Sequence, residues 1–146
     1  MSPSSVAQSW LFWAVLSAAF AALTAIFAKI GVAQINADLA TLLRTMVILA
    51  LVAAIAVGGG SWQPLSSVPG RSWLFIVLSG LATGASWLCY FRALKIGDAA
   101  RVAPVDKLSV VLVAVFGVVF LGERLSTTAG LGVGLIAAGA VLVALG

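Results

Sequence analysis

The sequence predicts an all-α polytopic membrane protein, a bundle of five transmembrane helices. Three observations predict this fold. Hydrophobic residues make up 63% of the 146 residues and charged residues only 8%, whereas a soluble domain averages about 25% charged residues. The apolar residues fall into five blocks, each long enough to cross a hydrocarbon core, which takes roughly 20 residues. Short loops join the blocks, so consecutive helices should run antiparallel and pack as a bundle.

The five helices are expected at residues 10–33, 39–57, 73–94, 99–121 and 127–145. The loop after the first helix contains Asn36 and Asp38, and either side chain can cap the second helix. The second helix should stop at the three glycines 58–60, because glycine readily releases a helix. Residues 61–70 contain two prolines and several serines, a composition typical of a loop.

The fourth and fifth helices also have recognisable starts. Asp98 is the expected N-cap of the fourth helix, and Pro104 lies inside its second turn. Proline removes one backbone hydrogen bond, so either a freed carbonyl faces solute or water, or the residue makes a structural kink. After a tight turn at residues 122–124, Ser126 or Thr127 can cap the fifth helix.

The chain is expected to form a single membrane domain over residues 1–146 with no soluble domain. Trp10, Trp62 and Trp73 lie near the expected lipid–water boundaries, as an interfacial aromatic belt should. The sequence has no histidine and only one cysteine, Cys89, so it lacks the usual general base, the commonest metal ligand and any intrachain disulfide. We therefore expect no enzyme activity, no catalytic residues, no cofactor and no metal. Basic residues form no run or patch, so no nucleic-acid partner is expected.

Several charged residues lie inside the spans rather than in loops. At a rise of about 1.5 Å per residue, four of them lie roughly 6–12 Å below their helix ends: Lys29, Arg44, Asp106 and Lys107. Charges at such depth usually face a cavity or a partner. For Lys29 and Arg44 the alternative is snorkelling to the headgroups. The side chain of Asp106 is too short for that, so it should pair with Lys29, Arg44 or a neighbouring helix.

Helical spacing gathers polar and aromatic side chains on one face of several spans. In the third span Ser79, Thr83, Ser86 and Tyr90 form a polar stripe beside Trp87. Together such faces could line a cavity that suits a small polar or amphiphilic solute. The alternative is that the hydroxyls bond their own backbone and the aromatic rings simply pack. The candidate substrate-binding residues are Trp13, Ser17, Lys29, Arg44, Thr83, Trp87, Tyr90, Pro104, Asp106, Lys107 and Ser109.

Small residues recur at four-residue spacing in two spans. Gly80 and Gly84 lie in the third, and Gly130, Gly134 and Ala138 in the fifth. Small residues let helix backbones approach closely, so the uncharged fifth span is expected to be a packing or dimer helix. Six of the eight basic residues fall on the side opposite the N-terminus. Because several of these lie within spans, the positive-inside bias is small, and it would permit dual insertion and an antiparallel homodimer.

The junction of the third and fourth spans resembles a known family. The residues concerned are Trp87 to Leu94, then Gly97, Pro104, Asp106-Lys107, Ser109 and Leu121-Gly122-Glu123, together with Lys29 and Arg44. This pattern resembles an EamA-type domain of the drug/metabolite transporter superfamily, and most closely its short five-span bacterial and archaeal branch. The resemblance implies a secondary transporter using alternating access. Typical members have ten spans in two inverted five-span repeats around a central site. The resemblance therefore implies that this chain is half of such a transporter and needs a second copy or a paralogue.

The same resemblance bears on coupling. Small multidrug-resistance relatives place an essential glutamate in their first helix, where this chain has no acid, and Asp106 would be the deeply placed acid available instead. We therefore expect a half-transporter that acts as a dimer and moves a small metabolite or amphiphilic solute across the inner (plasma) membrane. The alternative is a non-transporting integral membrane subunit that binds or stabilises a partner membrane protein.

Overall fold

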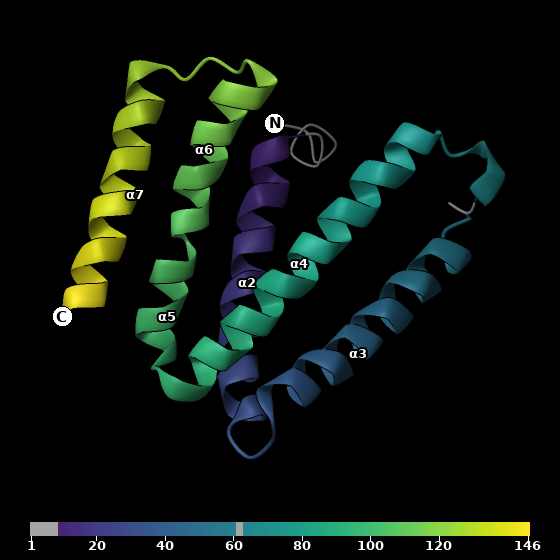
Figure 1. Ribbon diagram of the computed structural model, residues 1–146, viewed down its shortest axis with the longest axis horizontal. Helices are drawn as coiled ribbons and strands as arrows, with labels where there is room; N and C mark the ends of the chain where they lie inside the picture. Colours follow the sequence, from purple (N-terminus) through teal and green to yellow (C-terminus); the bar gives the residue numbers. More distant parts are fainter. Residues whose placement is uncertain (1–8, 61–62) are drawn as a thin grey trace. The chain divides into compact units, whose positions relative to one another are not determined.

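The computed structural model describes residues 9–60 and 63–146, and these residues form helices and loops with no strand. The elements in order are α2 (Trp10–Val32), α3 (Ala37–Gly58), the short 3₁₀ helix η1 (Leu65–Ser67), α4 (Gly70–Ile96), α5 (Ala99–Asp106), α6 (Leu108–Leu121) and α7 (Thr127–Leu145) (Figure 1). Five segments are long and apolar enough to cross a membrane, with α5 and α6 together forming the fourth. The predicted all-α fold with five spans is confirmed.

The spans keep most of their apolar surface on the outside. Only 6–11% of each span's most hydrophobic window is buried inside the chain. Large apolar side chains such as Ile30 (69% exposed) and Leu135 (74% exposed) have no protein covering most of their surface. A soluble monomer rarely exposes contiguous apolar surface on this scale. Lipid, or lipid together with a further protein, must therefore cover these helices.

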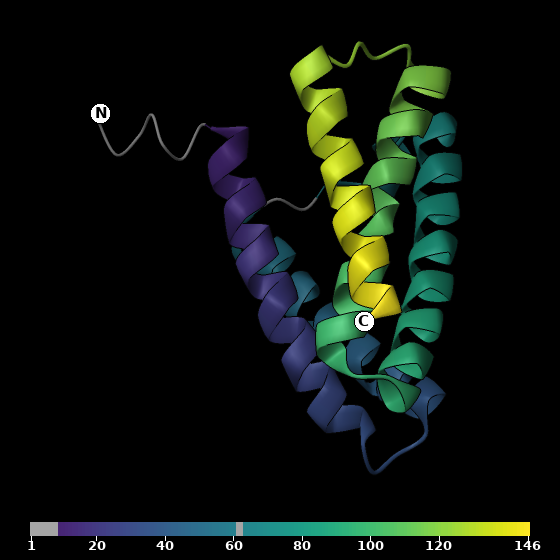
Figure 2. The same cartoon turned by 90° about the vertical axis from the view of Figure 1, so that its left-hand side faces the viewer.

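The chain forms two compact units, one from residues 1–28 with 96–146 and the other from residues 29–95. In the first unit α7 packs against both α5 and α6, and α7 returns antiparallel to α6 (Figure 2). Gly122 starts the connecting turn in the left-handed region, with φ of 67°. The N–H groups of Gly122 and Glu123 both donate to the carbonyl of Gly117. Helix α6 therefore ends in a tight glycine-based cap, as expected for this turn.

Side chains cap two of the helices at the predicted places. Ser126 caps α7, its Oγ accepting from the N–H of Ala129 at 3.2 Å. Asn36 caps α3, its Oδ1 accepting from the N–H of Asp38 at 2.8 Å and of Leu39 at 3.3 Å. Of the two caps considered for each helix, Asn36 and Ser126 are the residues used. Asp98 occupies the N-cap position of α5, but its side chain makes no capping hydrogen bond.

Some helix ends differ from the sequence-based expectation. Helix α3 starts two residues early because Asn36 rather than Asp38 is the cap. Helix α4 runs over Gly70–Ile96 instead of 73–94, since it begins directly after Pro69, a residue well suited to precede a helix. Of the expected interfacial tryptophans, Trp10 and Trp73 lie in the first turns of α2 and α4, and Trp62 lies outside the described residues.

The Asn36 cap supplies the first testable prediction. Replacing Asn36 by alanine leaves two N–H groups of the first turn without their acceptor, which typically costs about 1 kcal/mol. We expect the Asn36→Ala variant to unfold at a lower temperature in detergent than the parent. The matched control is Gln34→Ala, a change in the same loop at an exposed position. If both variants unfold at the parent temperature, the cap contributes nothing to stability.

Candidate functional site

Two lysines join the ends of α2 and α4 in the unit of residues 29–95. Lys29, in the last turn of α2, donates from Nζ to the carbonyl of Leu94 at 2.8 Å. Lys95, in the last turn of α4, donates to the carbonyl of Val32 at 3.2 Å and also to that of Ile35. Each helix therefore lends a cation to the C-terminal carbonyls of the other. The last carbonyls of a helix lack intrahelical partners and carry its negative dipole end, so both contacts are favourable.

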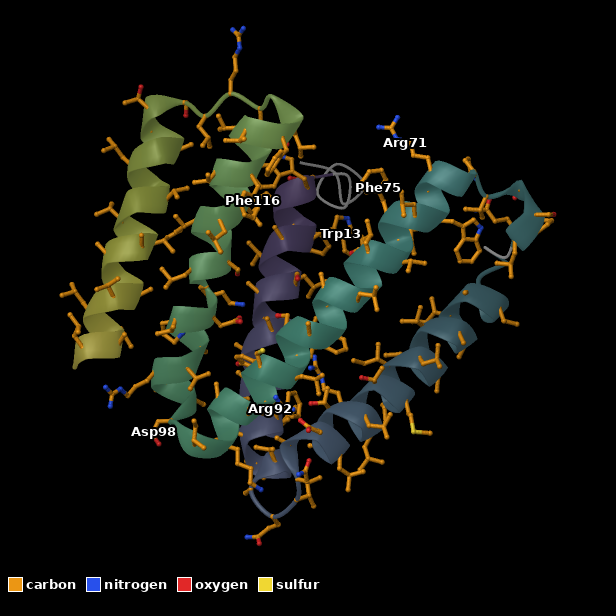
Figure 3. The ribbon with its side chains drawn as sticks, viewed as in Figure 1. Trp13, Arg71, Phe75, Arg92, Asp98 and Phe116 are labelled. Atoms are coloured by element: carbon orange, nitrogen blue, oxygen red, sulfur yellow. The ribbon has the colours of Figure 1, made fainter. Side chains whose placement is uncertain are left out.

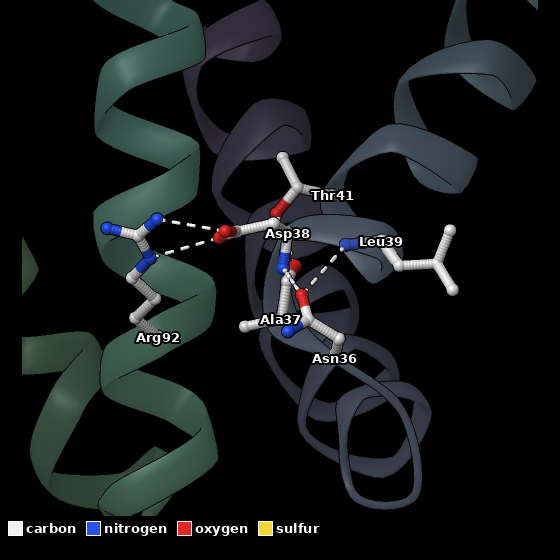
Figure 4. A network of polar contacts seen from close by, with 6 residues as sticks. All are labelled: Asn36, Ala37, Asp38, Leu39, Thr41 and Arg92. Carbon is white, nitrogen blue, oxygen red and sulfur yellow. Dashed lines mark hydrogen bonds and ion pairs between the residues drawn. The ribbon is translucent and has the colours of Figure 1, made fainter.

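The same junction contains an ion pair between α4 and the start of α3. Arg92 donates from Nε to Asp38 Oδ1 at 3.0 Å and from Nη2 to Asp38 Oδ2 at 2.9 Å. Figure 4 shows this two-pronged pair beside the Asn36 cap. Both side chains are exposed, and exposed pairs typically contribute about 0.2–1 kcal/mol. The pair therefore aligns α3 and α4 more than it stabilises them.

Deeper along the same two helices, Arg44 of α3 stacks on aromatic rings of α4. Its Cζ lies 4.1 Å from the ring centroid of Trp87 and 5.4 Å from that of Phe91. Arg44 and Trp87 are half-buried, and Phe91 is buried. These distances are within the range of cation–π attraction. The structure thus brings together two residues named from the sequence, Arg44 and Trp87, and adds Phe91.

The hydroxyl groups of α3 and α4 behave differently. Thr41 donates to the carbonyl of Ala37 at 2.9 Å and Thr45 to that of Thr41 at 2.8 Å. The hydroxyls of α3 thus bond their own backbone, as the packing alternative expects. On α4, Thr83 is exposed, as are the other two short hydroxyl residues of the stripe, Ser79 and Ser86. Among the described residues no hydrogen bond engages these three, so the polar stripe of α4 keeps its hydroxyls available.

The fourth span is interrupted rather than continuous. Helix α5 ends at Asp106, Lys107 forms a turn, and α6 starts at Leu108. Pro104 has no N–H and its ring crowds the preceding turn. Three residues after Pro104, the N–H of Lys107 is shared between Ala103 O at 3.3 Å and Pro104 O at 3.1 Å. A 3₁₀-type bond from Val110 N–H to Lys107 O at 2.9 Å then restarts the helix.

The break carries an ion pair made by adjacent residues. Lys107 Nζ lies 3.4 Å from Asp106 Oδ2, and the two side chains are 54% and 36% exposed. Asp106 was expected to pair with Lys29, Arg44 or a neighbouring helix. The ion pair that the structure describes is with its sequence neighbour. Pro104, Asp106, Lys107 and Ser109 therefore lie together at one interruption of one span.

The other residues named from the sequence lie apart from these groups. Trp13 and Ser17 are exposed on α2, and the ring of Trp13 meets that of Phe12 edge-on at 5.3 Å. Tyr90 is half-buried on α4, and Lys29 lies where the ends of α2 and α4 meet. The assignment of these residues to a solute site stays a prediction.

The list of candidate residues drawn from the sequence lacks three contributors that the structure identifies. Phe91 completes the ring pair under Arg44, and Lys95 caps α2. Arg101, at the start of α5, donates from Nη2 to the carbonyl of Ala144 near the end of α7 at 3.1 Å. One sequence signal was available for the lysines. Lys29 and Lys95 each lie in the last turn of a helix, where cations are favoured. The carbonyl groups that Lys95 and Arg101 contact lie more than 40 residues away in the sequence, so no local sequence pattern predicts these contacts.

Comparison with known proteins agrees with this membrane architecture. The model of the EamA-like transporter family matches residues 8–145. A protein of Sinorhizobium sp, described as an uncharacterized transporter in cobO 3'region, is 70% identical over 139 residues, which cover 95% of this chain and 99% of that protein. No solved structure matches the chain significantly. The chain therefore belongs to the EamA-like transporter family.

Proposed function

We propose that this chain is half of a secondary transporter, which moves a small metabolite or amphiphilic solute across the inner membrane by alternating access. One copy supplies five spans, so a second copy or a paralogous half completes the pathway. The eleven candidate residues named from the sequence, Lys29 and Arg44 among them, would border that pathway. Family membership supports a membrane transporter rather than an enzyme.

The observation that carries the proposal is the interrupted fourth span. Non-helical backbone at membrane depth is tolerated where it is buried in protein or lines a water-filled cavity. In transporters, discontinuous helices commonly form the substrate and ion sites. Here the interruption at Lys107 also holds an acid and a base, and ionisable groups within spans usually mark solute or ion pathways.

The same feature supports alternating access. Two half-helices, α5 and α6, meet at Lys107, and a hinge of this kind absorbs backbone rotation when one side of the site closes and the other opens. Solute that binds near Asp106 and Lys107 would shift the balance between the two states only if it contacts them differently in each. The ion pair of adjacent side chains can open to accept a polar solute group in one state.

The test measures which solutes cross a membrane containing the protein. Liposomes with and without the purified protein are loaded with a defined mixture of amino acids, carboxylates and amines, and the outside medium is followed by mass spectrometry. We expect a subset of solutes to leave faster from the protein-containing liposomes. The double change Asp106→Asn with Lys107→Gln should slow that efflux about tenfold, because it removes both charges at the break.

The matched control for this experiment is Asp98→Asn. Asp98 is an exposed acid at the start of the same span and makes no capping hydrogen bond, so its variant should retain parental efflux. Circular dichroism and elution volume confirm that each variant is folded. Equal efflux from the double variant and the parent would contradict the role given to the break. Absence of solute-selective efflux from the parent would contradict transport itself.

A further inference from the structure

We propose that Arg44, stacked on Trp87 and Phe91, binds the carboxylate of the transported solute, and that the solute is therefore a monocarboxylate with an apolar body. This inference rests on the proposed transport function and names its substrate class. Four features of the arrangement support it: the available N–H donors of Arg44, its depth along α3, the charge balance around it and the shape of the group it matches.

The ring contacts leave the N–H donors of Arg44 available. A guanidinium group is planar and carries its five N–H donors in that plane. Contact with the ring faces of Trp87 at 4.1 Å and Phe91 at 5.4 Å is a cation–π attraction, which needs no N–H donor. Among the described residues no hydrogen bond from Arg44 to an acceptor occurs. Arg44 is thus held in place by the rings with its donor fork uncommitted.

Arg44 also stays at membrane depth instead of reaching toward the headgroups. The ion pair of Arg92 and Asp38 provides a reference level on the two helices. At about 1.5 Å per residue, Arg44 lies roughly 9 Å beyond that level along α3, Trp87 about 7.5 Å beyond it along α4, and Phe91 about 1.5 Å. The guanidinium lies closer to the ring of Trp87 than to that of Phe91. The guanidinium therefore lies nearer the deeper of the two rings.

The charge balance of the unit favours an anionic guest. Arg92 is paired with Asp38, and Lys29 and Lys95 donate to backbone carbonyls. The ion pairs of the described residues are Arg92 with Asp38 and Lys107 with Asp106, so neither includes Arg44. A cation within a span is costly without a counter-charge. An incoming carboxylate would provide that counter-charge where attraction between charges is strong.

The shape of the group selects a carboxylate. The fork of an arginine matches the two oxygens of a carboxylate in a two-pronged pair. A phosphate dianion would need a second cation, and the cations at the ends of α2 and α4, Lys29, Arg92 and Lys95, are engaged. Aromatic rings beside the guanidinium offer an apolar wall to the rest of the solute. Phenylacetate is a probe with this chemistry, and phenylacetamide is its uncharged equivalent.

The experiment observes the arginine side chains directly. The chain has five arginines, so ¹⁵N-labelled protein in uncharged maltoside micelles gives five Nε–H resonances, which single Arg→Lys variants assign. We expect phenylacetate to move the Arg44 resonance to higher proton frequency in a saturable way, and phenylacetamide at equal concentration to leave it in place. Arg71 is the internal control, because it also lies over a ring, 5.9 Å from Phe75, but on the exposed first turn of α4 (Figure 3).

Binding to variants provides a second measurement. Arg44→Lys keeps the charge but loses the fork, so we expect at least tenfold weaker binding of phenylacetate, whereas Arg71→Lys should bind within twofold of the parent. A phosphatidylserine headgroup also offers a carboxylate, so the titration is repeated with that lipid added to the micelles. A shift of Arg44 by the lipid with none by phenylacetate would overturn the inference, as would no shift with either or equal shifts at Arg44 and Arg71.

These outcomes are distinguishable from failure of the transport proposal. If the liposomes release neutral or cationic solutes and Arg44→Lys releases them equally, transport stands and the carboxylate assignment fails. If phenylacetate binds at Arg44 but no solute crosses the membrane, the site stands and the transport proposal fails.

Discussion

Replacing Lys29 and Lys95 together by methionine should lower the free energy of unfolding by about 4 kcal/mol. Hydrogen bonds from charged donors contribute roughly 1.5–3 kcal/mol each, and each lysine also compensates a helix C-terminus. The carbonyls that would lose their partners belong to Val32 and Leu94, the two most deeply buried large residues, both 0% exposed. Methionine keeps most of the side-chain volume and helix propensity. The decrease in the free energy of unfolding therefore measures the contribution of the ammonium groups.

The measurement is thermal unfolding in detergent, where the expected loss is a decrease on the order of 10 °C in the midpoint. The matched control is Arg71→Met, which also removes an exposed cation from α4 but touches only the ring of Phe75 among the described contacts. The double variant should lose more stability than the sum of the two single variants. Each single variant still has one lysine between the two helix ends, whereas the double variant has none. A double variant as stable as Arg71→Met would show that the lysines do not hold the junction.

The sequence alone was sufficient for the spans and insufficient for their partners. Apolar blocks of about 20 residues are a direct consequence of bilayer thickness, so all five spans are recognisable without tertiary information. Asn36 and Ser126 were also identifiable, because a capping side chain bonds the backbone within three residues. Lys29 shows the opposite case. Its depth is visible in the sequence, but its acceptor, Leu94 O, is 65 residues away.

The candidate site was predicted in the same uneven way. Helical periodicity placed Arg44 and Trp87 on faces of their own helices, but only the pairing of α3 with α4 shows that the two side chains meet. Two hydroxyl residues near Arg44 on α3, Thr41 and Thr45, bond their own backbone. The difference between a lining hydroxyl and a back-bonded one is a choice of rotamer, which residue spacing does not encode.

Pro104 is visible in the sequence, but the irregular backbone lies C-terminal to it instead of N-terminal. Proline disturbs the backbone N-terminal to itself, since it lacks the bond to the carbonyl four residues earlier. The sequence therefore suggested a kink near the start of the fourth span. In the structure the helix ends only at Asp106, three-centre bonding falls on Lys107, and the charged pair lies at the break itself. This placement is what makes the break a candidate for transport.

Replacing Pro104 by alanine should change stability and transport in opposite directions. Alanine restores the N–H and has the highest helix propensity, and proline in a helix interior costs about 3 kcal/mol relative to it. The variant should unfold at a higher temperature than the parent in detergent. If the two arms α5 and α6 must rotate about Lys107 during transport, the same 3 kcal/mol would favour the straight form roughly a hundredfold, at 1.4 kcal/mol per factor of ten.

We therefore expect solute efflux from liposomes containing Pro104→Ala to be reduced by up to a hundredfold although the protein is more stable. Such a combination separates a functional hinge from a structural kink, because loss of a merely structural proline would leave transport unchanged or would lower stability and transport together. The control is Pro69→Ala, a change of the same chemistry directly before α4 and outside its helical segment. Parental efflux from a stabilised Pro104→Ala variant would remove the hinge from the mechanism, and the charges of Asp106 and Lys107 would then have to act on a rigid span.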